Sequence, residues 1–166
     1  INRSELNYHD VYFGIFNDSD LGYAWDDYVG SHVEGGSFLF YNGYEEDGSN
    51  EPEAYGSYPP AQSITVLAGP FMDADMQDNT EGGCNYSVNG LNFGNGVVDD
   101  ERYGLTRFTY FGSSAGVITA PVSAKDFYLY MKGYWRDNSP VMFGGYGHPS
   151  AGAVGPACRF MFPGDT

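Results

Sequence analysis

The side chains best suited to chemistry in this chain are acidic and fall into three clusters. The first joins Asp18 and Asp20 to Asp26 and Asp27 across a short turn that contains glycine. Ca²⁺ takes about six to eight oxygen ligands, and carboxylates within one loop are its usual source. We therefore predict calcium ligands here. The alternative is a solvated turn in which Asp and Asn cap their own backbone.

The second cluster follows Gly69-Pro70. It places Asp73, Asp75 and Asp78 at alternating and near positions of one loop. No His or Cys accompanies these acids, which favours calcium over zinc or copper. We predict a second calcium site, again with a solvated turn as the alternative.

The third cluster lies in residues 92–101 and offers Asn95, Asp99 and Asp100 near a glycine turn. Phe93 and Leu91 fall where ligands would be required if Gly96 were the turn glycine, so the match to a calcium loop is incomplete. Calcium ligation and solvated turns both remain open for this cluster.

Catalytic residues are harder to find. The three histidines are isolated from one another, and no serine lies in a nucleophile-elbow context. Paired carboxylates can cleave a glycosidic bond and aromatic rings can stack on sugars, but calcium loops explain the same acids without a tuned pKa. We expect no enzyme. Trp25 and Trp135 are expected in the core or at a strand edge.

The two cysteines, Cys84 and Cys158, match no metal-binding pattern. One such pair in a chain rich in Tyr, Gly and Asn indicates an extracellular disulfide, with two free thiols as the alternative. Patterns of the form N-x-Ser mark three candidate glycosylation sites, at Asn2, Asn17 and Asn85.

Short strands and turns must position these residues. Aromatic and β-branched runs bounded by Gly, Pro, Asn or Asp predict strands at residues 6–16, 37–41, 64–68, 106–111 and 158–162. The spacing of Phe127, Tyr130, Met131 and Tyr134 predicts one short helix over residues 123–134, capped by Ser123. We expect a mainly β, sandwich-like single domain over residues 1–166, with long loops of calcium-binding type.

The formal charge of −15 on 166 residues excludes several classes of partner. Nucleic acids and anionic membranes attract clustered Lys and Arg, so neither nucleic-acid binding nor membrane insertion is expected. Residues 1–100 hold 18 acidic groups and one basic group, whereas residues 101–166 hold four acidic and six basic groups. The unlike halves can attract each other within one chain or between copies, and head-to-tail association that does not close gives a filament.

Several strings, taken in order, resemble a module of large secreted and surface proteins of Bacteroidota exported by the type IX secretion system. They include VYFGIF at 11–16, AGPFMDAD at 68–75, VVDDERYG at 97–104 and FMFPGD at 160–165. The resemblance covers nearly the whole chain. It implies an extracellular location, β-rich modules, bound calcium and a structural or adhesive role.

These observations favour a non-enzymatic structural subunit of an extracellular or cell-surface fibre. Its partners would be copies of itself, and its cofactor would be calcium. Residues 6–16 are apolar on both faces, which suits a segment that completes the sheet of a neighbouring copy. The alternatives are a carbohydrate-binding or adhesive module, with glycans as partners, and an accessory domain of a secreted hydrolase.

Overall fold

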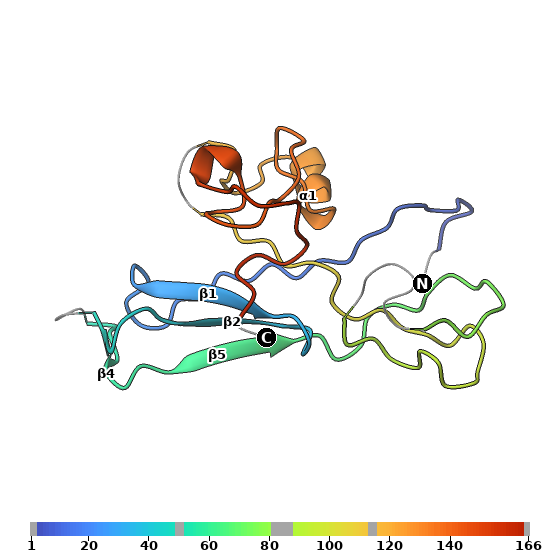
Figure 1. Ribbon diagram of the computed structural model, residues 1–166, viewed down its shortest axis with the longest axis horizontal. Helices are drawn as coiled ribbons and strands as arrows, with labels where there is room; N and C mark the ends of the chain where they lie inside the picture. Colours follow the sequence, from blue (N-terminus) through green and yellow to red (C-terminus); the bar gives the residue numbers. More distant parts are fainter. Residues whose placement is uncertain (1–2, 49–51, 81–87, 113–115, 165–166) are drawn as a thin grey trace.

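A three-stranded antiparallel sheet lies at the centre of the computed structural model, which describes residues 3–48, 52–80, 88–112 and 116–164 (Figure 1). Its strand order is β1-β2-β5, with bounds Asp27–His32, Ser37–Asn42 and Ala61–Thr65. A separate pair joins β3, Glu46–Asp47, to β4, Gly56–Ser57. The helices are α1, Ala124–Met131, and the 3-10 helix η1, Pro149–Ala151. The fold is mainly β with one short α-helix, as predicted.

Strand β2 has a buried face and an exposed face, and this fixes how it pairs with its neighbours. Phe38 and Phe40 are buried, whereas Tyr41 is exposed, because successive side chains of a strand point to opposite faces. Its pairing with β1 sets Asp27 opposite Asn42 at the end of the hairpin away from its turn. The sheet thereby brings an acid and an amide from separate segments to one place.

The two edges of the sheet differ. The C-terminal chain covers part of β1, since the Ser31 N–H donates to Phe162 O at 2.8 Å and the Gly164 N–H donates to Ser31 O at 2.7 Å. The Ser31 hydroxyl, fully buried, also donates to Met161 O at 2.9 Å. No strand formed by the described residues pairs with the outer edge of β5.

Two apolar clusters form the core. One lies on the sheet and contains Leu21, Phe38 and Phe40; the other surrounds Trp135 in the lobe that carries α1 (Figure 1). Phe108 connects the lobe to the sheet, because its ring stacks on that of Phe38 with centroids 5.4 Å apart. The second layer over the sheet is built from irregular chain and isolated bridges, such as Phe108 to Phe160.

Helix α1 begins as predicted. The Asp126 N–H donates to the Ser123 hydroxyl, and the Asp126 carboxylate accepts the Ser123 N–H in return, which completes a capping box. The helix ends at Met131, three residues before the predicted end, with Lys132 as its C-cap, and Gly133 follows with a φ of +79°. Only glycine adopts this left-handed conformation at no steric cost.

The predicted strand at residues 6–16 is wrong. This segment is extended but forms no strand, and it runs along the lobe toward the sheet (Figure 1). It touches the lobe through Tyr12 against Tyr128 and Phe16 against Phe111. Although its composition is typical of a strand, it does not join a sheet formed by the described residues.

Other local expectations need correction as well. The strands predicted at 106–111 and 158–162 make isolated bridges only, and the strand predicted at 64–68 is observed at Ala61–Thr65. Strand β1 was missed, because its acids were interpreted as loop residues. Trp135 is buried in the core as expected, whereas Trp25 is 81% exposed.

None of the helices formed by the described residues has the length and apolar character needed to span a membrane.

Candidate functional site

The first acidic cluster gathers around the end of the β1-β2 hairpin. Asp26 precedes β1, and its Oδ2 accepts the Gly48 N–H at 3.1 Å. Asp27 begins β1, and its Oδ2 accepts the Leu21 N–H at 2.8 Å. Each carboxylate thus uses one oxygen to hold a neighbouring loop in place.

Two members of this cluster were missed by sequence reasoning. Asp47 of β3 is fully buried, and its carboxylate accepts the N–H groups of Tyr23 and Tyr55. Asn42 ends β2 directly opposite Asp27, so both side chains lie on the same face of the sheet. The strand register, which only the fold reveals, is the signal that would have linked Asn42 to the acids.

Three buried oxygens of this first cluster have no hydrogen-bond partner: Asp26 Oδ1, Asp27 Oδ1 and Asn42 Oδ1. Burial raises the pKa of the Asp27 carboxyl, and the charges of Asp26, Asp47 and Asp20 act in the same direction. The cluster therefore concentrates negative charge, and several of its buried oxygens accept no hydrogen bond. Such a set of oxygens fits a hard cation.

The remaining residues predicted for this cluster lie farther out. Asp18 and Asp20 are exposed, and only the charge of Asp20 acts on Asp27. Asn17 is exposed too, and its amide donates to the Ser19 hydroxyl. Glycosylation at Asn17 stays a prediction, while Asn2 and Asn85 lie outside the described residues.

The second and third acidic clusters form one site. Residues 72–79 run beside residues 92–101, joined by Met72 N–H to Glu101 O at 3.0 Å and by Gly94 N–H to Asn79 O at 2.8 Å. We call this contact the loop seam. Asp99 Oδ1 accepts the N–H groups of Asp75 and Met76 at 2.7 and 2.9 Å. Sequence reasoning treated these loops separately, because nothing in their spacing indicates that they meet.

Within the loop seam the predicted ligands differ in role. Asp75 accepts from the Asn79 amide, and Asp78 Oδ2 accepts the Gly96 N–H at 2.6 Å. Asn95 donates to the Asp100 carboxylate at 3.2 Å. Asp73 is exposed at the margin. The most deeply buried acid, Glu101, was not among the predicted ligands.

Within the described ranges, no group of three or more His, Cys, Asp and Glu side chains is arranged so that it could hold a metal ion. Calcium binding at the first cluster and at the loop seam stays a prediction.

A chain of Ser150, His148 and Asp137 resembles a catalytic triad in composition. His148 Nδ1 lies 2.6 Å from the Ser150 hydroxyl, and its Nε2 lies 3.3 Å from Asp137 Oδ2. However, Nδ1 also accepts the Ser150 main-chain N–H at 3.1 Å, which makes His148 the N-cap of η1. Helix capping accounts for this arrangement.

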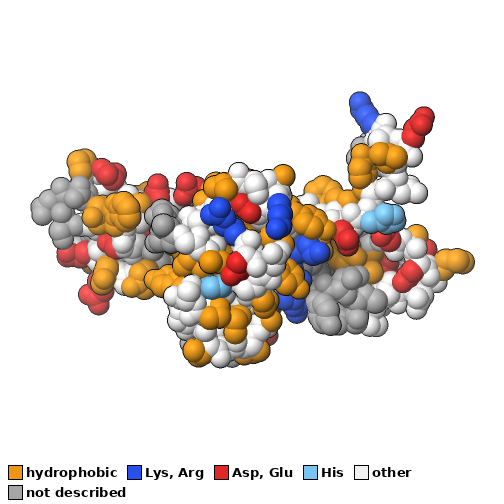
Figure 2. Space-filling view, turned by 90° about the horizontal axis from the view of Figure 1, so that it is seen from above, with side chains coloured by type: hydrophobic (Ala, Val, Ile, Leu, Met, Phe, Trp, Pro, Cys, Tyr) orange, Lys and Arg blue, Asp and Glu red, His pale blue; other side chains and the backbone are white. Residues whose placement is uncertain are grey.

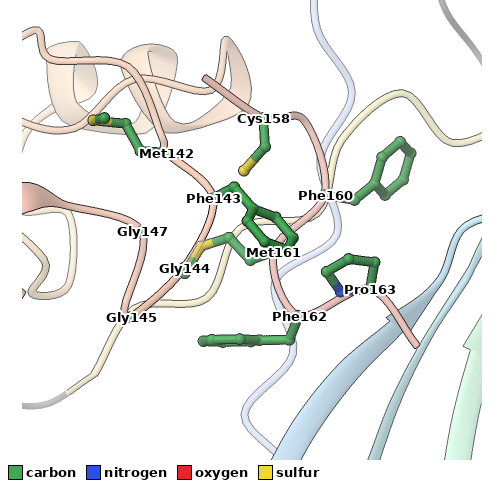
Figure 3. Close-up of a pocket in the computed structure, with 10 residues that line it drawn as sticks. All are labelled: Met142, Phe143, Gly144, Gly145, Gly147, Cys158, Phe160, Met161, Phe162 and Pro163. Carbon is green, nitrogen blue, oxygen red and sulfur yellow. The ribbon is translucent and has the colours of Figure 1, made fainter. Parts of the chain in front are cut away.

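An apolar pocket of about 210 Å³ lies between residues 142–147 and residues 158–163. Figure 3 shows the Cys158 sulfur between the two segments, near Phe143 and Met161. Burial raises the pKa of the Cys158 thiol. Within the described residues Cys158 forms no disulfide, and its expected partner Cys84 lies outside them. The disulfide stays a prediction.

Comparison of the chain with family models, curated proteins and solved structures found no match in any of the three.

Proposed function

We propose that this chain is a non-enzymatic, extracellular structural module that binds calcium and associates head-to-tail with copies of itself. The observation that carries the proposal is the N-terminal segment, residues 3–20, which forms no strand and exposes large apolar side chains. Among its large apolar side chains, Phe13 is 79% exposed, and Leu6, Ile15 and Phe16 are each about two-thirds exposed. Several large apolar side chains exposed in one segment indicate an interaction site.

The charge distribution supports association between copies. The acidic excess belongs to residues 1–100, whereas most basic residues follow Glu101. In Figure 2, most Lys and Arg side chains gather over the middle of the molecule, with acids toward both ends. Opposite patches steer encounter and fix register when two copies meet. A contact between unlike surfaces of successive copies extends into a filament unless it closes.

A surface variant tests the proposal without disturbing the fold. Phe13→Ser with Ile15→Ser removes two exposed apolar groups, while Tyr12 and Phe16 keep their contacts with the lobe. Val122→Ser with Val154→Ser is the matched control, because both valines are exposed on the lobe. We expect the wild type and the control to form large particles, and the first variant to stay monomeric with an unchanged circular dichroism spectrum.

Light scattering after size-exclusion chromatography measures the mass, and electron microscopy in calcium-containing buffer records the particle shape. A wild type that stays monomeric at millimolar concentration contradicts the proposal. So does a Phe13→Ser, Ile15→Ser variant that assembles as the wild type does.

The exposure of Trp25 favours a second candidate, a carbohydrate-binding surface. Trp25 lies directly before Asp26 of the first acidic cluster, and Tyr28 of β1 packs edge-on against Tyr41 of β2 on the exposed face of the sheet. Exposed aromatic rings can stack on sugars. A glycan array distinguishes this candidate, because binding that is lost in Trp25→Ala favours it and an array without binders counts against it.

A further inference from the structure

The loops that form the loop seam are held without an apolar core. No described residue in 66–80 or 88–105 belongs to either apolar cluster. The buried residues of these two ranges are both polar, Asn79 and Glu101, while Phe71 and Met76 are exposed. Hydrophobic burial, the dominant stabilising term in most domains, is therefore small here.

Carboxylates connect the two sides of the loop seam instead. Glu101 reaches from the second segment into the first, where its Oε1 accepts the Asn79 N–H. Asp78 reaches from the first segment into the second, where its Oδ2 accepts the Gly96 N–H at 2.6 Å. The two acids cross the loop seam in opposite directions, and both are directed into it.

Each of these acids leaves its other oxygen buried and unpartnered. Glu101 Oε2 and Asp78 Oδ1 are inaccessible to solvent and accept no hydrogen bond. The Glu101 residue as a whole is only 1% exposed. An ionised carboxylate in this situation is costly unless a cation or a donor compensates it. The ion pairs found among the described residues, Arg136 with Asp126 and His148 with Asp137, lie outside the loop seam.

We propose that the loop seam binds a Ca²⁺ ion through Glu101 Oε2 and Asp78 Oδ1, and that this ion clamps residues 72–79 to residues 92–101. The surrounding acids, among them Asp75, Asp99 and Asp100, supply further negative charge. This inference deepens the calcium part of the proposed function and does not depend on self-association.

The chemistry of the loop seam favours calcium among common metal ions. Neither segment contains His or Cys, which zinc and copper prefer. Ca²⁺ accepts irregular sets of oxygens from flexible loops, whereas Mg²⁺ demands near-ideal octahedral geometry and keeps several waters. Both segments are loops whose carboxylates are already shared with main-chain donors, so an adaptable coordination shell is required.

Isothermal titration calorimetry of the full chain with CaCl₂, after chelation and at a concentration where the protein is monomeric, tests the proposal. Glu101→Gln removes one charged ligand with little change in shape, and Asp78→Asn does the same on the other side. Glu53→Gln is the matched control, because Glu53 is exposed and the same single charge is lost. We expect the affinity of one site to fall at least tenfold in both test variants and to stay unchanged in the control.

Limited proteolysis gives a second readout. In the wild type, calcium should protect residues 72–79 and 92–101 from cleavage, and this protection should be lost in Asp78→Asn. If Glu101→Gln does not fold, Asp78→Asn decides, because Asp78 is only half-buried.

Two results overturn the loop-seam site. One is a wild type that binds no calcium at millimolar concentration. The other is undiminished binding in Asp78→Asn and in any folded Glu101→Gln, which would assign the ion to the first cluster. Self-association is scored separately by light scattering, so a failure of this site and a failure of assembly are distinguishable.

Discussion

Replacing Trp135 tests whether the lobe is held by one buried side chain. Trp135 is fully buried, its indole N–H donates to Gly147 O at 2.7 Å, and its ring packs edge-on against Tyr130 with centroids 5.4 Å apart. Trp135→Ala removes all of these contacts and leaves a cavity. Truncation of a buried Trp typically costs about 3–5 kcal/mol of unfolding free energy.

Trp135→Phe separates the hydrogen bond from the packing. The phenyl ring keeps part of the volume but removes one of the two hydrogen bonds that the buried Gly147 carbonyl accepts, because the Met142 N–H still donates to it at 2.8 Å. The expected cost of losing that one hydrogen bond is about 0.5–1.5 kcal/mol. Trp25→Ala is the matched control. Trp25 is 81% exposed, so its truncation should change the unfolding free energy by no more than about 0.5 kcal/mol.

Urea unfolding followed by far-UV circular dichroism measures these differences. With a slope of about 2 kcal/mol per molar urea, a loss of about 4 kcal/mol lowers the midpoint by about 2 M. Trp135→Phe should fall between the wild type and Trp135→Ala. Equal midpoints for Trp135→Ala and Trp25→Ala would refute the assignment of Trp135 to the core.

Three further perturbations have expected outcomes. Ser123→Ala removes the N-cap of α1 and should lower the unfolding free energy by about 1 kcal/mol, measured by urea unfolding. Burial raises the pKa of Tyr130 to about 12, so stability should fall as the pH rises above about 10, and Tyr130→Phe should flatten that alkaline slope in thermal melts. Gly22→Ala places a Cβ against the Asp47 carboxylate at a φ of +78° and should lower the melting temperature, whereas Gly94→Ala, which meets only open space, should lower it less.

The sign of the Tyr130 prediction follows from proton binding. A raised pKa means that the folded state keeps the phenol proton at a pH where the unfolded state has released it. Unfolding therefore releases protons between about pH 10 and 12, and higher pH favours it. The Tyr130 hydroxyl also donates to Thr119 O at 2.6 Å, so Tyr130→Phe should lose stability at neutral pH as well. A wild type whose stability is constant up to pH 12 would contradict this account.

Local signals in the sequence were enough for the helix and for β2. The capping box at Ser123 and Asp126 is a short-range pattern, and it forms as the residues predict. The aromatic and apolar run at residues 37–41, bounded by glycine and asparagine, likewise predicts β2. Both features depend on interactions within a few residues of the chain, which sequence patterns describe well.

The acidic sites required the tertiary fold. Asn42 lies opposite Asp27 through strand register, and the Glu101 carboxylate accepts the Asn79 N–H across 22 positions of the chain. The spacing of residues along the sequence predicts neither contact. Asp47 was missed for the same reason, because a buried acid in a two-residue strand looks like a member of a charged surface loop until its N–H donors are known.

The error at residues 6–16 is informative, because a strand requires a partner as well as a suitable sequence. The segment has the composition of a strand and lacks an edge, while β5 has an edge and lacks a strand among the described residues. Edge strands with open N–H and C=O groups are templates for pairing with another chain. Under the proposed function, the N-terminal segment of one copy would therefore extend the sheet of the next at β5.

Hydrogen exchange read by mass spectrometry tests this last prediction. In the assembled protein, the main-chain amides of Ala61–Thr65 and of residues 6–16 should gain protection together, because each segment would supply the other's hydrogen-bond partners. The monomeric Phe13→Ser, Ile15→Ser variant provides the unassembled reference. Assemblies in which β5 exchanges as fast as in that reference would rule out strand addition at β5, even if the N-terminal segment still drives association by burying its apolar side chains.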